Sequence, residues 1–136
     1  MNTQNRIFFI KLPYWLGILA DALWAVALFY PGVFGMLTGQ NDFNPDLQIR
    51  LIMDIGGTLM TGWTLLLLWA VRQPLERRTV ILITAFPVVF GLMVIAFLGF
   101  LGGNTSNIWI LIKNTILIIS MMISYVLAGK MNQDKV

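Results

Sequence analysis

Three ionisable side chains lie inside otherwise apolar stretches of this sequence: Asp21, Asp54 and Lys113. Arg50 stands four residues before Asp54, so these two side chains share one face of a helix. An ionisable group inside a bilayer costs about 2.5–3.5 kcal/mol on insertion scales, and such groups rarely face lipid. These four residues are therefore the candidates for binding a polar ligand, for pairing with one another, or for carrying a proton.

Asp54 and Lys113 are expected at similar depth. Asp54 lies three residues past Leu51, and Lys113 lies five residues past Ile108, near the starts of two apolar stretches that enter the membrane from the same side. With a helical rise of about 1.5 Å per residue, both lie roughly 5–10 Å below that boundary. An ion pair between them is possible, with Arg50 closing over it. This trio either fixes the register of the helices or lines a polar pocket, open to the outer side, for a small polar or amphipathic ligand.

Asp21 is expected nearer the midplane, where the sequence offers it no obvious partner. Desolvation there favours the neutral acid over the carboxylate ion. Two interpretations remain open. Asp21 is either a protonated acid hydrogen-bonded to a Thr or Ser of another helix, or a carboxyl group that carries a proton as part of the function.

The elements that must position these residues are membrane-spanning helices. The hydrophobic fraction is 58% and the charged fraction 11%, against about 25% charged residues in an average soluble domain. A helix needs about 20 mostly apolar residues to cross a bilayer, and four stretches qualify, at approximately residues 12–34, 51–71, 80–102 and 108–129. The predicted fold class is all-α, an integral membrane four-helix bundle that forms a single domain over residues 1–136.

Two residues predict local features of this bundle. Asp46 stands immediately before the second stretch, where its side chain can cap the helix. Pro87 lies in the middle of the third stretch and predicts a kink, because proline cannot donate a backbone hydrogen bond.

Basic residues predict the orientation of the chain. Seven of the nine Lys and Arg residues lie in the two terminal segments and the middle loop: Arg6, Lys11, Arg72, Arg77, Arg78, Lys130 and Lys135. The positive-inside rule therefore predicts an integral membrane protein with cytoplasmic N and C termini. The three arginines of the middle loop are also placed to touch anionic lipid. No nucleic-acid partner is expected, because the basic residues are divided among three membrane-proximal segments.

Composition excludes several chemistries. The chain has no Cys and no His, so disulfides, thiolate nucleophiles and imidazole bases or ligands are absent. No phosphate-binding loop or nucleophile motif is present either. We expect no metal and no cofactor, and the catalytic residues of an enzyme, if it is one, are unknown.

Three classes of function remain. The first is a membrane protein that binds or transports a small polar or amphipathic ligand. The second is a structural or accessory subunit, which would form homo-oligomers or join another membrane protein through helix faces of small residues. The third, which the lack of His disfavours, is a membrane enzyme for a lipid-soluble substrate, with Asp54 or Asp21 as acid or base.

In architecture the sequence resembles the small multidrug resistance transporters, which also have four short spans and an acidic residue in the first. The chain departs from that family in having Asp21 where the family has Glu, in its longer first loop, and in Asp54 and Lys113. The resemblance is confined to architecture and implies no family membership.

Overall fold

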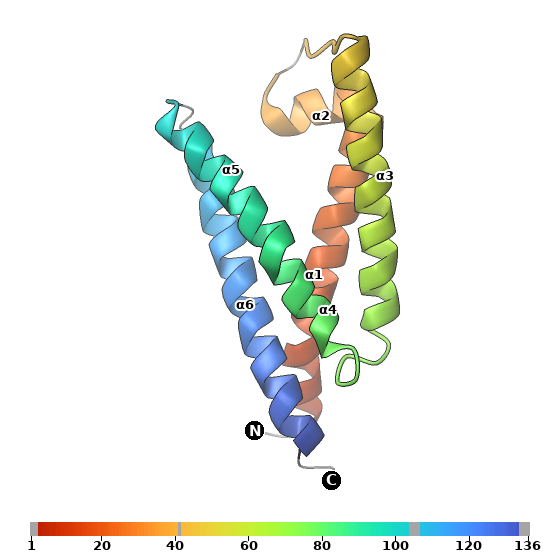
Figure 1. Ribbon diagram of the computed structural model, residues 1–136, viewed down its shortest axis with the longest axis vertical. Coiled ribbons are helices and arrows are strands. Elements are labelled where there is room, and N and C mark those ends of the chain that lie inside the picture. The colour runs from red at the N-terminus through yellow and green to blue at the C-terminus, as the bar shows by residue number, and fades with distance from the viewer. Residues whose placement is uncertain (1–2, 41, 104–106, 134–136) are drawn as a thin grey trace. The chain divides into compact units, whose positions relative to one another are not determined.

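The computed structural model describes residues 3–40, 42–103 and 107–133, which form helices joined by turns and loops (Figure 1). No strand occurs in these ranges. Four helices are long and apolar enough to cross a membrane: Gln4–Phe29, Leu47–Ala70, Arg78–Leu101 and Ile108–Met131. The predicted four apolar helices are confirmed, and they indicate an integral membrane protein. The side of the membrane on which the termini lie stays a prediction.

The helices form two compact units. The first unit comprises residues 1–16 and 69–136, and the second comprises residues 17–68. Helices α1 (Thr3–Phe29) and α3 (Leu47–Ala70) contribute residues to both units. Each unit is therefore described by its own contacts.

In the second unit, α1 ends earlier than the apolar stretch does. The stretch was expected to continue to about residue 34, but the helix ends at Phe29. Tyr30 has extended backbone angles (φ −120°, ψ 97°), as expected for a residue before proline, and Pro31 begins the short helix α2 (Pro31–Thr38). Helix α2 ends at Gly39, whose positive φ of 75° suits a residue without Cβ.

Helix α3 begins with the cap that the sequence predicts. The carboxylate Oδ1 of Asp46 accepts a hydrogen bond from the backbone N–H of Ile49 at 2.8 Å. Further along, α3 presents two glycines to α1. A Cβ built on Gly56 would lie 3.2 Å from Leu28, and one on Gly57 would lie 3.1 Å from the Phe29 ring. These glycines allow the two helices to approach closely.

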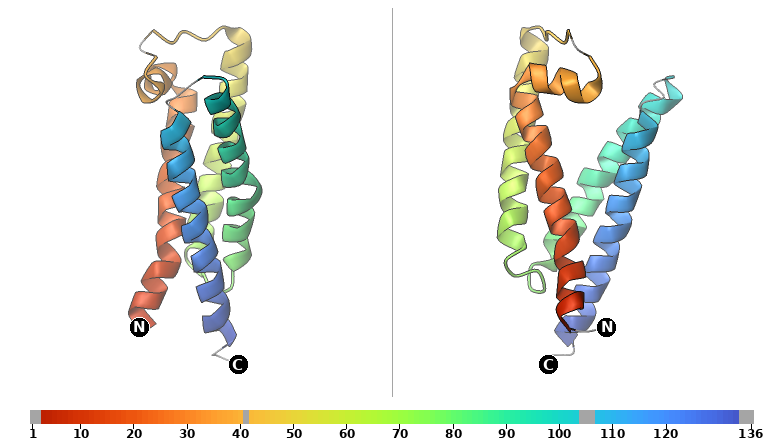
Figure 2. Two further views of the ribbon diagram at one scale, coloured as in Figure 1. Left: turned by 90° about the vertical axis from the view of Figure 1, so that its left-hand side faces the viewer. Right: turned by 180° about the vertical axis from the view of Figure 1, so that it is seen from behind.

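The third apolar stretch, in the first unit, is broken at its predicted kink. It consists of α4 (Arg78–Ile83), a π-helical segment η1 (Thr84–Val89) and α5 (Phe90–Leu101). Phe86 has extended angles (φ −122°, ψ 124°), and the Phe86–Pro87 peptide bond is cis. The interruption thus lies at Pro87, as predicted. Helix α6 (Asn107–Gln133) runs beside α5 in the opposite direction (Figure 2).

The N-terminal part of α1 is held to the rest of the first unit by hydrogen bonds and apolar packing. The buried Ser124 hydroxyl donates to the carbonyl of Ile10 at 2.8 Å. The Tyr14 hydroxyl donates to the carbonyl of Arg77 at 3.3 Å. The apolar residues packed at this end are Ile10, Ala128, Met131, Leu75 and Leu127.

Large apolar side chains remain exposed on every long helix. Leu19, Ile52, Ile95 and Ile116 are each more than 60% exposed in the isolated chain. An exposed apolar surface of this extent suits hydrocarbon rather than water.

Candidate functional site

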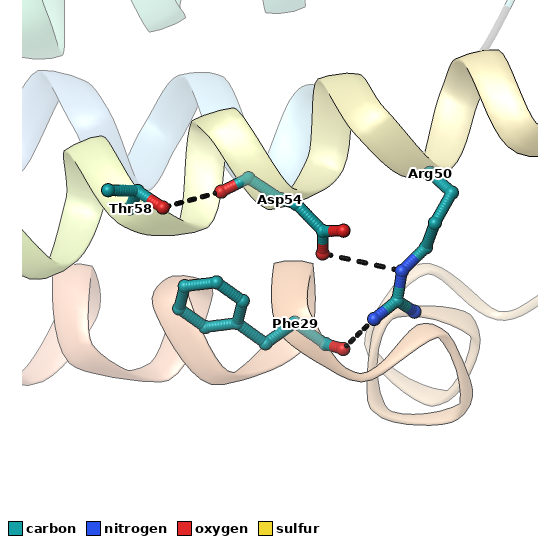
Figure 3. Close-up of polar contacts among 4 residues, drawn as sticks. All are labelled: Phe29, Arg50, Asp54 and Thr58. Carbon is teal, nitrogen blue, oxygen red and sulfur yellow. Dashed lines mark hydrogen bonds and ion pairs between the residues drawn. The ribbon is translucent and has the colours of Figure 1, made fainter.

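Arg50 and Asp54 lie together on α3 and reach the end of α1 (Figure 3). Arg50 Nε is 3.3 Å from Asp54 Oδ1, and the two side chains are 37% and 41% exposed. An Arg50 terminal nitrogen donates a hydrogen bond of 2.7 Å to the carbonyl of Phe29. The guanidinium thus joins two helices of the second unit, whereas Asp54 pairs within its own helix.

The Phe29 carbonyl is left without a helical partner because α1 stops there. In a continuing helix it would accept from the N–H of Val33, but that N–H donates to Tyr30 at 2.9 Å instead. The last carbonyls of a helix also carry its partial negative charge. Arg50 therefore satisfies the C-terminal end of α1, and Asp54 partly neutralises Arg50.

Lys113 lies exposed on α6, in the first unit, whereas Asp54 belongs to the second. Their ion pair stays a prediction. Asp54 already has a cationic partner in Arg50, four residues away on the same helix. The structure therefore brings together two members of the predicted trio.

Asp21 is half-buried on α1, and its Oδ2 atom is buried without a hydrogen-bond partner among the described residues. Gly17 and Ala25, one turn before and one turn after it, are buried as well. Asp21 therefore belongs to a packed face of α1. An unsatisfied buried polar atom is uncommon in proteins and calls for a partner.

The residues of α3 that lie at the same height as Asp21 follow from the way α1 and α3 pack. Helices α1 and α3 run in opposite directions, and Leu28 packs at Gly56 (Figure 1). Asp21, seven residues before Leu28, therefore lies near the level of Trp63, and Thr64 is the next residue on α3. The Thr64 hydroxyl donates its proton to the carbonyl of Met60 at 2.8 Å, so it can only accept a hydrogen bond from elsewhere.

A second buried polar residue was missed by sequence analysis. Asn114 is only 5% exposed, and its Nδ2 atom is buried without a partner among the described residues. The buried face of α6 continues through Met121, Ser124 and Ala128. The seven-residue spacing of positions 114, 121 and 128 indicates this buried face in the sequence. The predicted site residue was instead the charged neighbour, Lys113.

Among the residues that the structure describes, no group of three or more Asp, Glu, His or Cys side chains could hold a metal ion. Comparison of the chain with known protein families, with curated proteins and with solved structures gives no match. The polar residues within the helices are therefore the basis for a functional proposal.

Proposed function

We propose that this chain is an integral membrane protein with a polar intramembrane site for a small polar or amphipathic ligand, and that Asp21 is the group that binds the ligand or a proton. The observation that carries the proposal is the buried, unpartnered Oδ2 of Asp21 on a packed face of α1. Ionisable side chains within membrane spans commonly mark ligand or proton pathways.

The surroundings of Asp21 indicate what kind of ligand it would take. Thr61 and Thr64 on α3 both donate their hydroxyl protons to carbonyls of their own helix, at 2.8 Å. These two hydroxyl protons are therefore not available to the buried Oδ2 atom of Asp21. The missing donor is best supplied by a proton or by a cationic group such as an ammonium, so an amphipathic amine is the ligand class that we favour.

We assign Arg50 and Asp54 a structural part in this protein. The Arg50 guanidinium is engaged by the Phe29 carbonyl and by Asp54 before any ligand arrives. A ligand at this pair would have to displace contacts that hold α1 to α3. The participation of Lys113 in a ligand site stays a prediction.

An accessory subunit is the second candidate function. A Cβ built on Gly62 or on Gly91 would meet no atom within 4 Å, so no other part of the chain packs against these two glycines. Small residues of this kind allow close helix–helix association in membranes. A second copy or another membrane protein would pack at these positions.

Binding of dodecylamine to the purified full chain in mild detergent tests the Asp21 proposal. At neutral pH the probe is an ammonium with an alkyl chain, and dodecanol is its uncharged control. Asp21→Asn should weaken dodecylamine binding at least about tenfold, because it removes a charge-assisted contact of about 1.5–3 kcal/mol. Asp54→Asn, the matched control in the same unit, should leave the affinity within about twofold, well below one such contact.

Two results would contradict the assignment. Equal binding of dodecylamine and dodecanol by the wild-type chain would show that the charge is not recognised. Loss of dodecylamine binding in Asp54→Asn but not in Asp21→Asn would move the site to the Arg50–Asp54 pair. Subunit counting by native mass spectrometry on the same samples addresses the accessory-subunit alternative.

A further inference from the structure

Basic side chains gather at one end of the first unit. The N-terminal part of α1, the loop before α4 and the end of α6 meet there (Figure 2). Glu76 is the one acidic residue of this unit within the described ranges. The basic residues are Arg6, Lys11, Arg72, Arg77, Arg78 and Lys130, and Lys135 lies outside the described residues.

The apolar packing at this end positions several of these charges. Ile10 packs with Ala128 and Met131, so Lys11 and Lys130 are carried by neighbouring positions on two packed helices. Charged side chains beside a packed cluster of this kind extend their charged groups toward water or headgroups. The same packing therefore gathers cationic groups from α1 and α6 at one boundary.

Arg77 and Arg78 are held by aromatic rings. The Arg77 guanidinium lies 3.6 Å from the centroid of the Trp69 ring and also donates to the Trp69 carbonyl. The Arg78 guanidinium lies 5.4 Å from the Tyr125 ring and occupies the space beside Gly129, where a Cβ would overlap it. Both groups are thus oriented before any anion binds.

These arginines have aromatic partners but no carboxylate partner in the described ranges, where the one ion pair is Arg50–Asp54. Their positive charge is therefore free to interact with an anion from outside the chain. Planar guanidinium groups bind phosphate through paired hydrogen bonds.

We propose that Arg77 and Arg78, with Lys130, which follows Gly129 on α6, bind the phosphate of an anionic phospholipid headgroup. A lipid fits better than free phosphate because exposed apolar residues of the same unit, Phe8 and Trp69, offer contacts for acyl chains. Basic residues next to membrane helices attract anionic lipids, and aromatic residues favour the same interface. This site is separate from Asp21 and does not rest on the proposed ligand.

Lipid retention by the full chain tests the proposal. Phosphatidylglycerol and phosphatidylcholine are titrated into the protein in mild detergent, and bound lipid is measured by native mass spectrometry. Wild type should bind phosphatidylglycerol more tightly than phosphatidylcholine. Arg78→Gln should weaken phosphatidylglycerol binding about fivefold, the effect of one basic residue at a membrane surface. Gly129→Ala should do the same without changing the net charge, because it expels the Arg78 guanidinium from its place.

The matched control is Arg72→Gln, which removes the same charge from an exposed residue of the loop that precedes α4. It should change phosphatidylglycerol binding by less than about twofold, below the effect of one engaged basic residue. If Arg72→Gln and Arg78→Gln weaken binding equally, the attraction is diffuse and the proposed site is wrong. If inorganic phosphate displaces the lipid at equal concentration, the site takes free anions and the lipid assignment is wrong. Arg78→Gln adds no volume, so it decides the matter even if Gly129→Ala unfolds the chain.

Discussion

Replacing Arg50 should destabilise the chain several times more than replacing Asp54, although the two side chains form one ion pair. Arg50→Gln removes a charge-assisted hydrogen bond to the Phe29 carbonyl, which is worth about 1.5–3 kcal/mol where water is excluded. Its side chain is 37% exposed, which places the loss nearer the lower end of that range. Asp54→Asn removes only a pair between successive turns of one helix, worth about 0.3–0.5 kcal/mol.

The assay is equilibrium unfolding of the full chain in mixed micelles, with helical circular dichroism as the signal. Arg50→Gln, Asp54→Asn and the double variant form a double-mutant cycle, whose coupling energy should be about 0.5 kcal/mol. Arg50→Lys is the conservative control. Lysine keeps the positive charge but lacks the several N–H donors with which the guanidinium contacts the Asp54 carboxylate and the Phe29 carbonyl at once. The free energy of unfolding of Arg50→Lys should therefore fall between those of wild type and Arg50→Gln.

One pattern of results would refute this reasoning. If Asp54→Asn cost as much as Arg50→Gln, the carboxylate would have a stronger partner than Arg50. A coupling of more than about 1 kcal/mol between Asp54→Asn and Lys113→Gln would identify that partner as Lys113 and support the ion pair predicted from the sequence.

The same unfolding assay checks two further contacts. Gly57→Ala should leave the chain about 1–3 kcal/mol less stable than Gly62→Ala, because the methyl at residue 57 would press on the Phe29 ring whereas the methyl at residue 62 meets nothing. Equal effects of the two substitutions would contradict the packing. Ser124→Ala should cost about 0.5–1.5 kcal/mol, because it removes a buried hydrogen bond between α6 and α1. Ser120→Ala should cost less, because that hydroxyl bonds only within its own helix, and the reverse order would speak against the α1–α6 contact.

Much of the fold follows from local sequence. Length and apolar character are enough to predict four long helices, because a bilayer leaves few other ways to satisfy the backbone. The cap at Asp46 and the interruption at Pro87 are also local, since each depends on one residue and its immediate neighbours. These are the predictions that the structure confirms.

The polar contacts were harder to predict because they depend on helix rotation and on helix ends. Depth alone matches Asp54 with Lys113, yet depth does not tell which way a side chain faces. Because α1 ends early, the Phe29 carbonyl has no helical donor and accepts a hydrogen bond from Arg50. This carbonyl is uncharged, so matching charges along the sequence does not reveal it as a partner of Arg50. Asn114 and Lys113 show the same dependence, because the rotation of α6 buries the amide and exposes the lysine, and composition alone does not give that rotation.

Hydrogen bonding distinguishes Asp21 from Asp54, the two acidic residues that lie within the long helices α1 and α3. Asp54 pairs with Arg50 on its own helix, so its negative charge is balanced by a residue that moves with it. Asp21 has a buried oxygen without a donor, at a level where the Thr64 hydroxyl has already donated its proton. A donor from outside the helices would satisfy this oxygen, and for this reason we expect a proton or an ammonium group to bind at Asp21 rather than at the Arg50–Asp54 ion pair.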